Sequence, residues 1–243
     1  MKKGLVLAGG FGTRLSPLTI ATSKQLLPIY DKPVIFYPLK TLKDMGYLDI
    51  LIIAGNKEQE DIYKKLLGDG SQHGLNLEYI IQDYPRGLAD AFIIGEDFIG
   101  DADEICLILG DNIIINENPI VPEKNKIFTF AVKTPELYGV VTTNEDGTID
   151  RLVEKPNEFL SENAVIGLYI FDNKVVEIAK KLEPSSRGEL EIVDLILKIN
   201  KIEPIKVEKL DGIWLDIGDV DSLLDCGNLV RTISKRTTRT IGL

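Results

Sequence analysis

The stretch LVLAGGFGTRLSPLT, residues 5–19, decides the expected fold. Its first four residues, 5–8, form an apolar run that is typical of a buried strand, and a glycine-rich loop follows directly. A glycine loop after the first strand of an α/β sheet places bare backbone amides where such sheets bind ligands. Arg14 adds a guanidinium that can hold phosphate oxygens. The stretch therefore predicts a phosphate-binding turn at the start of an α/β fold.

Two familiar phosphate loops do not fit this stretch. The Walker A loop needs Gly-Lys-Ser/Thr after four spacer residues, and residues 13–15 read Thr-Arg-Leu. The dinucleotide-binding loop needs a third glycine where Leu15 stands. A glycine-rich turn alone is structural about half the time. The following segment SKQLLPIYDKP, residues 23–33, favours function, because Arg14 and Lys24 together could neutralise a triphosphate; otherwise Lys24 is a solvated loop lysine.

The first half of the chain alternates between strand-like and helix-like patterns. Short β-branched runs predict strands, and apolar residues at helical spacing predict helices between them. This alternation indicates a mostly parallel sheet with helices on both faces. The expected strands are 5–8, 50–54, 77–82 and 104–109, and the expected helices are 33–45, 58–67 and 88–98.

The second half is richer in strands, and no Pro/Ser-rich linker separates it from the first. We therefore expect one mixed α/β domain over residues 1–243. Its second half should contain strands at 127–133, 139–143, 149–153, 165–171, 205–210 and 213–215, helices at 173–182 and 190–200, and a last helix from about residue 220.

The composition excludes several classes of protein. The chain has 28 Lys and Arg against 38 Asp and Glu, and a net charge of −10 would repel nucleic acid. No apolar run approaches the roughly 18 residues of a membrane helix, and the N-terminal apolar stretch is too short for a signal peptide. A single histidine excludes a His-rich zinc site, and the two cysteines, Cys106 and Cys226, belong to no metal-type spacing. We expect a cytoplasmic protein with no membrane or nucleic-acid partner, whose metal, if any, has oxygen ligands.

Two aspartates follow apolar strands and are candidates for such a metal site. Asp111 comes after the strand at 105–109, and Asp216 comes after Ile213-Trp214-Leu215. Ligands of α/β sheets bind at the carboxyl ends of strands, and paired carboxylates suit Mg²⁺. Taken alone, each aspartate would be a turn or cap residue about three times in four. Trp214 itself is expected to be a core residue.

The motifs in their order resemble those of the sugar-phosphate nucleotidyltransferases. GGFGTRLSPLT (9–19) and SKQLLPIYDKP (23–33) resemble the N-terminal signature of that family, and the wording KQLLP resembles its glucose-1-phosphate thymidylyltransferases, in a short form. Phe11 stands where those enzymes more usually have serine. The likeness continues through QDYPRGLADAF (82–92), LILGDN (107–112), YGVV (138–141), VEKP (153–156), NAVIGLYIFD (163–172), SSRGELEIVD (185–194) and IWLDIGD (213–219).

The resemblance implies a single Rossmann-like domain over residues 1–243, with a mostly parallel mixed sheet flanked by helices. A nucleotide-binding half would extend to about residue 112, a β-rich sugar-phosphate-binding half over about 113–220, and a C-terminal helix over about 220–236. The implied reaction transfers dTMP from dTTP to α-D-glucose 1-phosphate, giving dTDP-glucose and pyrophosphate by Mg²⁺-assisted in-line attack on the α-phosphorus. The product would supply deoxysugar biosynthesis.

The resemblance also assigns roles to single residues. Arg14, Lys24 and Lys155 would be catalytic, and Asp111 and Asp216 would hold Mg²⁺. Gln82 would read the thymine edge with its amide, although a surface glutamine before a turn would be the ordinary interpretation. Glu189 and Glu191 belong to the match without an assigned role. The nucleotide site would comprise Leu7, Gly9, Gly10, Gly12, Thr13, Gln25, Gln82, Pro85, Gly87 and Leu88, and the sugar-phosphate site Tyr138, Gly139, Glu154, Lys155, Val165 and Gly167.

Other functions remain open at this point. UTP could replace dTTP, or serve beside it, because the two nucleotides differ by one methyl and one hydroxyl group. A non-catalytic nucleotide-sugar-binding relative would be expected to have lost Arg14, Lys24, Asp111 or Asp216, and all four are present. A nicotinamide-dependent dehydrogenase fails at Leu15. We expect a homo-oligomer, either a dimer or a tetramer, and weak or absent feedback inhibition by dTDP-sugars, because longer thymidylyltransferases add C-terminal helices.

Overall fold

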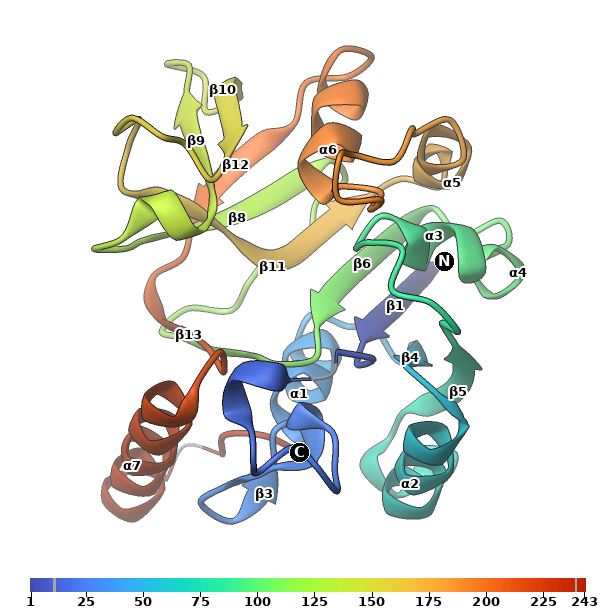
Figure 1. Ribbon diagram of the computed structural model, residues 1–243, viewed down its shortest axis with the longest axis vertical. Coiled ribbons are helices and arrows are strands. Elements are labelled where there is room, and N and C mark those ends of the chain that lie inside the picture. The colour runs from blue at the N-terminus through green and yellow to red at the C-terminus, as the bar shows by residue number, and fades with distance from the viewer. Residues whose placement is uncertain (11, 239) are drawn as a thin grey trace. The chain divides into compact units, whose positions relative to one another are not determined.

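Figure 1 shows the computed structural model, which describes residues 1–10, 12–238 and 240–243. Phe11, and with it the expected departure in the phosphate loop, lies outside the described residues. Contacts along the chain divide it into two compact units, each made of several segments. The loop unit comprises Lys3–Pro85, Ile108–Ile120 and Gly212–Leu243, and the hairpin unit comprises Met1–Lys2, Arg86–Leu107 and Val121–Asp211. The expected division into halves near residue 112 stays a prediction.

The loop unit contains parallel strands with helical connections. β1 (Lys2–Leu7) pairs with β4 (Asp49–Ala54), and β4 pairs with β5 (Asn76–Ile81), both in parallel register. α1 (Phe36–Asp44) precedes β4, and α2 (Lys57–Leu67) connects β4 to β5. Nearly every residue of β4 is buried, as expected for a parallel strand that is covered on both faces. The alternating pattern of the sequence therefore forms the expected βαβ arrangement.

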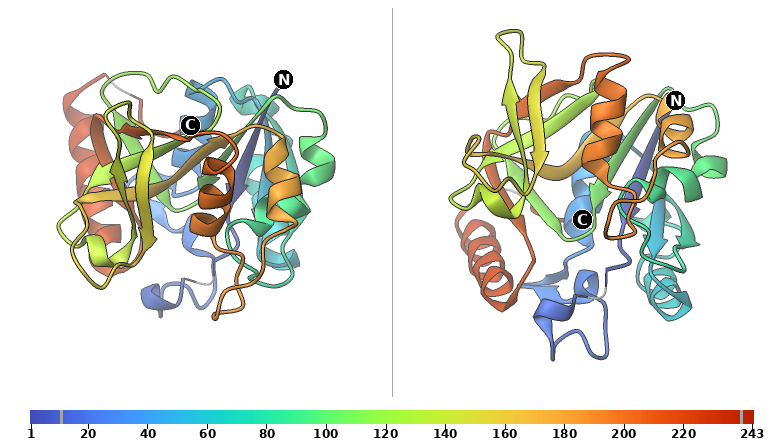
Figure 2. Two further views of the ribbon diagram at one scale, coloured as in Figure 1. Left: turned by 90° about the horizontal axis from the view of Figure 1, so that it is seen from above. Right: turned by 45° about the horizontal axis from the view of Figure 1, so that its top comes forward.

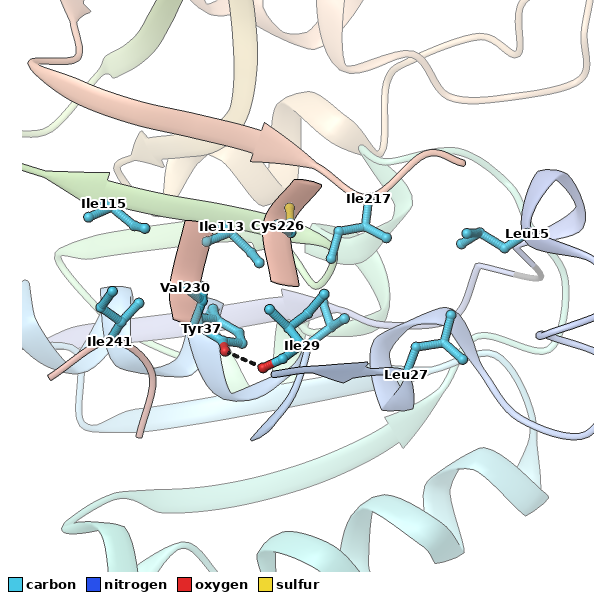
Figure 3. Packing of buried hydrophobic residues seen from close by; sticks show 11 residues of the cluster. Leu15, Leu27, Ile29, Tyr37, Ile113, Ile115, Ile217, Cys226, Val230 and Ile241 are labelled. Atoms are coloured by element: carbon cyan, nitrogen blue, oxygen red, sulfur yellow. Dashed lines mark hydrogen bonds between the residues drawn. The ribbon is translucent and has the colours of Figure 1, made fainter. Parts of the chain in front are cut away.

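A second layer of the loop unit is built from segments distant in sequence. β7 (Asn112–Asn116) pairs antiparallel with β13 (Gly212–Asp216), and β2 (Pro28–Ile29) pairs with β3 (Lys32–Pro33). α7 (Val220–Arg236) packs against β2 and β13. Figure 3 shows the apolar cluster that joins these elements, in which the buried Tyr37 hydroxyl donates to the Ile29 carbonyl at 2.9 Å. The cluster includes Leu15, Leu27, Ile29, Val34, Tyr37, Ile113, Ile115, Ile217, Cys226, Val230 and Ile241.

The hairpin unit contains a mixed sheet. β9 (Gly139–Thr143) and β10 (Ile149–Glu154) form an antiparallel hairpin, and the strand order continues through β11 (Asn163–Phe171) to β6 (Glu104–Leu109). β8 (Lys126–Ala131) pairs antiparallel with β11 and parallel with β12 (Lys206–Lys209). α6 (Ile192–Asn200), orange in Figure 2, packs against β10. The remaining helices are α3 (Asp90–Ile94), α4 (Glu96–Ile99) and α5 (Lys174–Ala179).

The expected class is confirmed: the chain is an α/β protein with mixed sheet flanked by helices. Across the described residues, every helix is too short or too polar to cross a bilayer.

Three details of the sequence prediction were wrong. The helix expected at 33–45 begins at Phe36, because Lys32 and Pro33 pair with β2 instead. The helix expected at 88–98 is two short helices that meet at Gly95, a poor helix former. β7 was not predicted, although residues 113–115 are three isoleucines, because it follows the turn at Asp111 directly; only its pairing with β13 is invisible in the sequence.

The N-terminus of α7 gives a test of this packing. The Asp219 carboxylate accepts a hydrogen bond from the Ser222 amide at 2.8 Å, and the Ser222 hydroxyl accepts one from the Asp219 amide at 3.0 Å. Replacing Asp219 by alanine should cost about 1 kcal/mol of unfolding free energy in urea titration at pH 7. Hydrogen bonds from Ser222 lower the pKa of Asp219, so this stabilisation should be lost as the pH falls through the lowered value.

Asp221→Ala is the matched control, because Asp221 is an acidic residue of the same first turn without the capping bonds. It should cost clearly less than Asp219→Ala, since only the helix dipole is affected. Equal losses for the two variants would contradict a specific cap at Asp219.

Candidate active site

The glycine-rich loop is held tightly at its start. The Ala8 amide donates to the Ile53 carbonyl at 2.8 Å, and the Tyr63 hydroxyl, buried on α2, donates to the Ala8 carbonyl at 3.0 Å. A Cβ on Gly9 would lie 2.9 Å from the backbone of Gly55, so a larger residue would force these strand ends apart. The loop backbone is therefore fixed before it reaches the exposed Gly10.

A second contact closes the loop at its far side. Gly12 has φ +59, a left-handed conformation that glycine adopts without strain, and its carbonyl accepts from the Thr19 hydroxyl at 2.8 Å. A Cβ there would lie 3.1 Å from the Lys24 Cβ. The glycine thus allows the segment that carries Lys24 to lie directly against the phosphate loop. Thr13 and Arg14 follow in an exposed turn of 3-10 helix.

Antiparallel pairing of β7 with β13 brings the two predicted metal ligands to one place. Asn112 lies opposite Asp216 in the register, and the Ile217 amide donates to the Asp111 carbonyl at 3.1 Å. Burial, and then the nearby charge of Asp111, raise the pKa of Asp216, while Lys24 and Arg14 act in the opposite direction. Both aspartates therefore share one electrostatic environment, although they are far apart in sequence.

Two cations complete this cluster. The Lys24 ammonium forms an ion pair with Asp111, and both side chains are largely buried. The Arg14 guanidinium lies against Gly218, where a Cβ would come within 3.2 Å of it. Arg14, Lys24, Asp111 and Asp216 are thus brought together within the loop unit, as predicted for a site that binds phosphate and a metal ion.

The donor set fits a hard divalent cation with few protein ligands. Among the described residues no group of three or more His, Cys, Asp or Glu side chains forms a ready-made metal cage. Two carboxylates remain, Asp111 and Asp216, and burial together with the charge of Asp111 raises the pKa of Asp216, so a nearby positive charge favours its ionised form. Mg²⁺ suits such a site, because it commonly takes one or two carboxylates and completes its shell with substrate phosphates and water.

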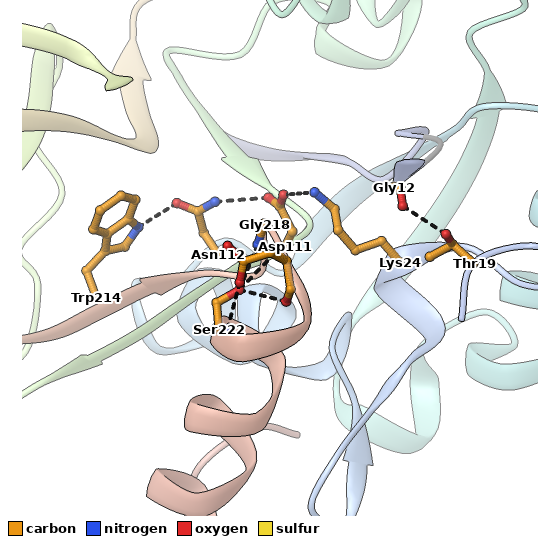
Figure 4. Close-up of polar contacts among 9 residues, drawn as sticks. Gly12, Thr19, Lys24, Asp111, Asn112, Trp214, Gly218 and Ser222 are labelled. Carbon is orange, nitrogen blue, oxygen red and sulfur yellow. Dashed lines mark hydrogen bonds and ion pairs between the residues drawn. The ribbon is translucent and has the colours of Figure 1, made fainter. Parts of the chain in front are cut away.

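A chain of hydrogen bonds orients Asp111, as Figure 4 shows. The Trp214 indole donates to Asn112 Oδ1 at 2.7 Å, Asn112 Nδ2 donates to Asp111 Oδ1 at 3.0 Å, and Lys24 contacts the other oxygen. Trp214 is buried, as expected for a core residue. Its indole nitrogen also has a polar role, which the sequence analysis missed because apolar neighbours surround it in sequence.

Gln25 is the most buried of the predicted nucleotide-binding residues with a polar side chain. It is 2% exposed, and its Oε1 has no hydrogen-bond partner within the described part of the chain. A Cβ on Gly110 would lie 3.1 Å from Gln25 Cγ and 2.9 Å from the Leu7 carbonyl, so these residues pack closely. Buried polar atoms are rarely left unpaired, and Gln25 therefore offers an acceptor to a donor group of a ligand. Gln82 directly follows β5, and its backbone amide donates to the Ala54 carbonyl at 2.8 Å.

The hairpin unit holds the predicted sugar-phosphate residues. Glu154 lies opposite Gly139 in the β9–β10 register, and the Lys155 amide donates to the Tyr138 carbonyl at 2.9 Å. A Cβ on Gly139 would come within 3.2 Å of Glu154 Oε2, so glycine leaves room for this carboxylate. Val165 and Gly167 are buried on the neighbouring β11, whose Ala164 pairs with Val140. These residues therefore lie on three adjacent strands.

Two cations and two further carboxylates, Glu191 and Asp194, act on Glu154. Burial raises the pKa of Glu154, while Lys155 and Arg187 lower it. Lys155 Nζ lies 3.9 Å and Arg187 Nη2 4.0 Å from Glu154 Oε1. Lys155 has φ +45, which a non-glycine residue rarely adopts and which often marks a functional position. Arg187 was not among the predicted site residues, although it stands in the matching motif SSRGELEIVD.

The predicted nucleotide residues Gly87 and Leu88 also belong to the hairpin unit, whereas Pro85 ends a segment of the loop unit. Gly87 has φ +99, and a Cβ there would lie 2.4 Å from the Leu190 carbonyl oxygen. The turn therefore depends on glycine for both its conformation and its close contact.

Comparison with known proteins identifies the family. The sequence pattern described as Nucleotidyl transferase matches residues 3–232. The chain belongs to the nucleotidyl transferase family. It is 46% identical over 241 residues to a glucose-1-phosphate thymidylyltransferase of Neisseria meningitidis, covering 95% of this chain and 83% of the relative. It is 45% identical to the Mycolicibacterium smegmatis protein of the same name, covering 99% of this chain and 86% of the relative.

Solved structures of nucleotidyltransferases have the same fold. A Bacillus anthracis protein, provisionally named a glucose-1-phosphate thymidylyltransferase and crystallised with a sucrose, superposes with a TM-score of 0.87 at 37% identity, covering 95% of this chain and 96% of that one. A UDP-glucose pyrophosphorylase complexed with UDP-glucose gives 0.84 at 27% identity, covering 96% and 99%. The resemblance drawn from the motifs is therefore confirmed at the level of the family.

The Trp214 hydrogen bond can be tested in this nucleotidyltransferase. Phenylalanine at position 214 keeps the ring and removes the donor, so Asn112 loses the bond that orients it toward Asp111. Partners of this kind typically change activity by about 10–100-fold, and we expect a loss near the lower figure in pyrophosphate release. Tyr79→Phe is the control, because it removes one aromatic donor, to the Gly68 carbonyl, elsewhere in the same unit. Equal activities of the two variants would contradict a role for the indole.

Proposed function

We propose that the chain transfers thymidylate from dTTP to α-D-glucose 1-phosphate, releasing pyrophosphate and forming dTDP-glucose. The observation that carries the proposal is the meeting of Arg14 and Lys24 with Asp111 and Asp216 at the phosphate loop. The curated relatives at 45–46% identity are named for this reaction, which favours dTTP over the UTP alternative. All four charged residues that a non-catalytic relative would be expected to lose are present.

The reaction needs anions to be brought together and held in line. A phosphate oxygen of glucose 1-phosphate attacks the α-phosphorus of dTTP, a new phosphorus–oxygen bond forms, and the bond to the β-phosphate breaks. We assign Arg14 to the departing pyrophosphate and Lys24 to the triphosphate near its α-phosphate. Gly9, Gly10, Gly12 and Thr13 would offer backbone amides to the phosphates. Contacts that strengthen as charge develops are typically worth about 2.7–4 kcal/mol each.

Asp111 and Asp216 would hold Mg²⁺. When bound, the ion would polarise the phosphoryl group and neutralise part of the triphosphate charge. Asn112 and Trp214 would keep Asp111 oriented for this role, and Lys24 would share the Asp111 carboxylate with the ion.

The two substrates would be recognised by separate sets of residues. Gln82 would pair with the imide edge of thymine, with Leu7, Pro85, Gly87 and Leu88 around the nucleoside and Gln25 as a buried acceptor. Lys155 would bind the sugar phosphate and Glu154 the sugar hydroxyls, with Tyr138, Gly139, Val165 and Gly167 lining the pocket. Arg187 provides a second cation beside Lys155. We further propose a cytoplasmic homo-oligomer, a dimer or a tetramer, that supplies deoxysugar synthesis.

The substrate assignment is tested by measuring pyrophosphate release with glucose 1-phosphate and Mg²⁺ across dTTP, UTP, CTP, ATP and GTP. We expect kcat/KM to be highest for dTTP. Gln82→Ala should lower kcat/KM for dTTP by roughly 10–100-fold, because a buried base edge would lose its partner. Gln72→Ala, which changes an exposed glutamine of the same unit, is the control. Equal kcat/KM for UTP and dTTP would remove the thymidylyl assignment and keep the nucleotidyl transfer.

Lys24→Met separates turnover from metal binding. The variant should lose roughly 100–1,000-fold in kcat, because the triphosphate loses its cation. It should also bind Mn²⁺ alone more tightly, by roughly fivefold, because the Lys24 ammonium no longer neutralises Asp111. Electron paramagnetic resonance of free Mn²⁺ measures this affinity without nucleotide.

Two controls accompany this variant. Lys40→Met removes the same charge from an exposed pair with Asp44 and should leave Mn²⁺ affinity unchanged. Asp111→Asn should abolish Mn²⁺ binding. Unchanged Mn²⁺ affinity in Asp111→Asn would refute Asp111 as a metal ligand. Weaker Mn²⁺ affinity in Lys24→Met would refute only the idea that Lys24 and the ion share the Asp111 carboxylate.

A further inference from the structure

The segment Ser185–Glu191 of the hairpin unit forms a closed turn before α6. The Ser185 amide donates to the Glu189 carbonyl at 2.8 Å, and the Gly188 amide donates to the Ser185 carbonyl at 2.8 Å. Gly188 has φ +77, which suits the reversal of the chain. The segment is therefore held in one shape by its own backbone.

One end of this segment is fixed to the turn that carries Gly87 and Leu88. The Leu190 amide donates to the Arg86 carbonyl at 2.7 Å, and the Ala89 amide donates to the Leu190 carbonyl at 3.2 Å. The close contact of Gly87 with the Leu190 backbone adds to these bonds. Both polar backbone groups of Leu190, its amide and its carbonyl, thus bond to the turn at residues 86–89, which we call the nucleoside turn.

The next residue, Glu191, holds Arg187. Its Oε1 accepts from the Ser185 hydroxyl at 2.7 Å and from Arg187 Nε at 3.2 Å, and its Oε2 accepts from Arg187 Nη2 at 2.9 Å. The Glu191 side chain is 16% exposed, whereas that of Arg187 is 48% exposed. A forked contact of this kind fixes the plane of a guanidinium that would otherwise move freely in solvent.

The Glu191 carboxylate bonds to Arg187 and does not cap α6, the helix that begins at the next residue. Glu191 occupies the N-cap of α6, where a side-chain oxygen commonly accepts from the first helical amides, and its carboxylate makes no such bond. The carboxylate is instead turned toward Arg187, which lies 4.0 Å from Glu154. The Glu191 carboxylate therefore holds a cation that lies near Glu154.

We propose that Glu191 is a positioning residue that fixes Arg187 beside Glu154 and Lys155, in a place set by the nucleoside turn through the adjacent Leu190. The proposal rests on the proposed function, in which Lys155 binds the sugar phosphate, and it adds Arg187 as a second cation for that phosphate. It assigns Glu191 no contact with substrate. Because Leu190 is bonded to residues 86 and 89, the guanidinium would be placed relative to that turn as well as to Glu154 and Lys155.

The test is steady-state kinetics of Glu191→Gln with dTTP and glucose 1-phosphate. The KM for glucose 1-phosphate should rise roughly tenfold, because Arg187 is no longer held in place, while the KM for dTTP stays within about twofold, because the Leu190 backbone bonds remain. Glu191→Asp should give an intermediate KM. Glu96→Gln is the matched control, since it breaks an ion pair with Lys180 in the same unit.

A double-mutant cycle with Arg187→Ala separates positioning from a general loss of structure. In the Arg187→Ala background, Glu191→Gln should cause no further rise in the KM for glucose 1-phosphate. A further rise there, or a change under twofold in the single variant, would overturn the proposal. Should Glu191→Gln fold poorly, Ser185→Ala removes the hydroxyl that donates to Glu191 and accepts from the Arg187 amide, and its KM shift should likewise vanish in the Arg187→Ala background.

The same assay distinguishes failure of the proposed function from failure of the role of Glu191 alone. If the unchanged chain releases no pyrophosphate from dTTP and glucose 1-phosphate, the proposed function fails and the role of Glu191 fails with it. If the unchanged chain is active and Glu191→Gln has the same KM values as the unchanged chain, only the role of Glu191 is overturned.

Discussion

Antiparallel pairing of β7 with β13 is the constraint on which the site in the loop unit depends. It sets Asn112 opposite Asp216 and so brings Asp111 to the same end of the ribbon. Side chains alternate along a strand, so a slip of one residue would turn Ile113 and Ile115 away from the apolar cluster. The same burial that stabilises the ribbon therefore fixes the register of the two carboxylates. Gly212 permits the close approach, since a Cβ there would lie 2.2 Å from the Ile115 carbonyl oxygen.

Rigid support surrounds the charged groups of this unit. Trp214 and Asn112 hold one oxygen of Asp111 through successive hydrogen bonds, and Tyr63 ties the start of the glycine loop to α2. Each support comes from a buried side chain, whose position is set by packing rather than by the ligand. Groups held in this way need little reorganisation when a substrate arrives, which is the general basis of electrostatic catalysis.

The sequence predicted the parts of this molecule that local patterns determine. Alternation of apolar runs and helical spacing identified the parallel strands. The ordered motifs identified the family and most charged residues of the candidate site. The pairing of β7 with β13 could not be read from either segment, because it depends on residues distant in the chain. The polar role of Trp214 and the contact of Arg187 with Glu154 were hidden for the same reason. Gly95, by contrast, was visible in the sequence and was given too little weight as a helix breaker.

The chain has a net charge of −10, and most cations of its two charged clusters are paired with carboxylates. Lys24 lies beside Asp111, Lys155 beside Glu154, and Arg187 between Glu191 and Glu154, whereas the Arg14 guanidinium lies against Gly218. A carboxylate neighbour holds the cation in position, and it also reduces the positive potential that an incoming phosphate meets. Phosphate would then bind by exchanging partners with a carboxylate rather than by filling an unopposed positive field. Affinity in such a site would depend on the geometry of a few pairs, to which a positioning residue such as Glu191 would contribute.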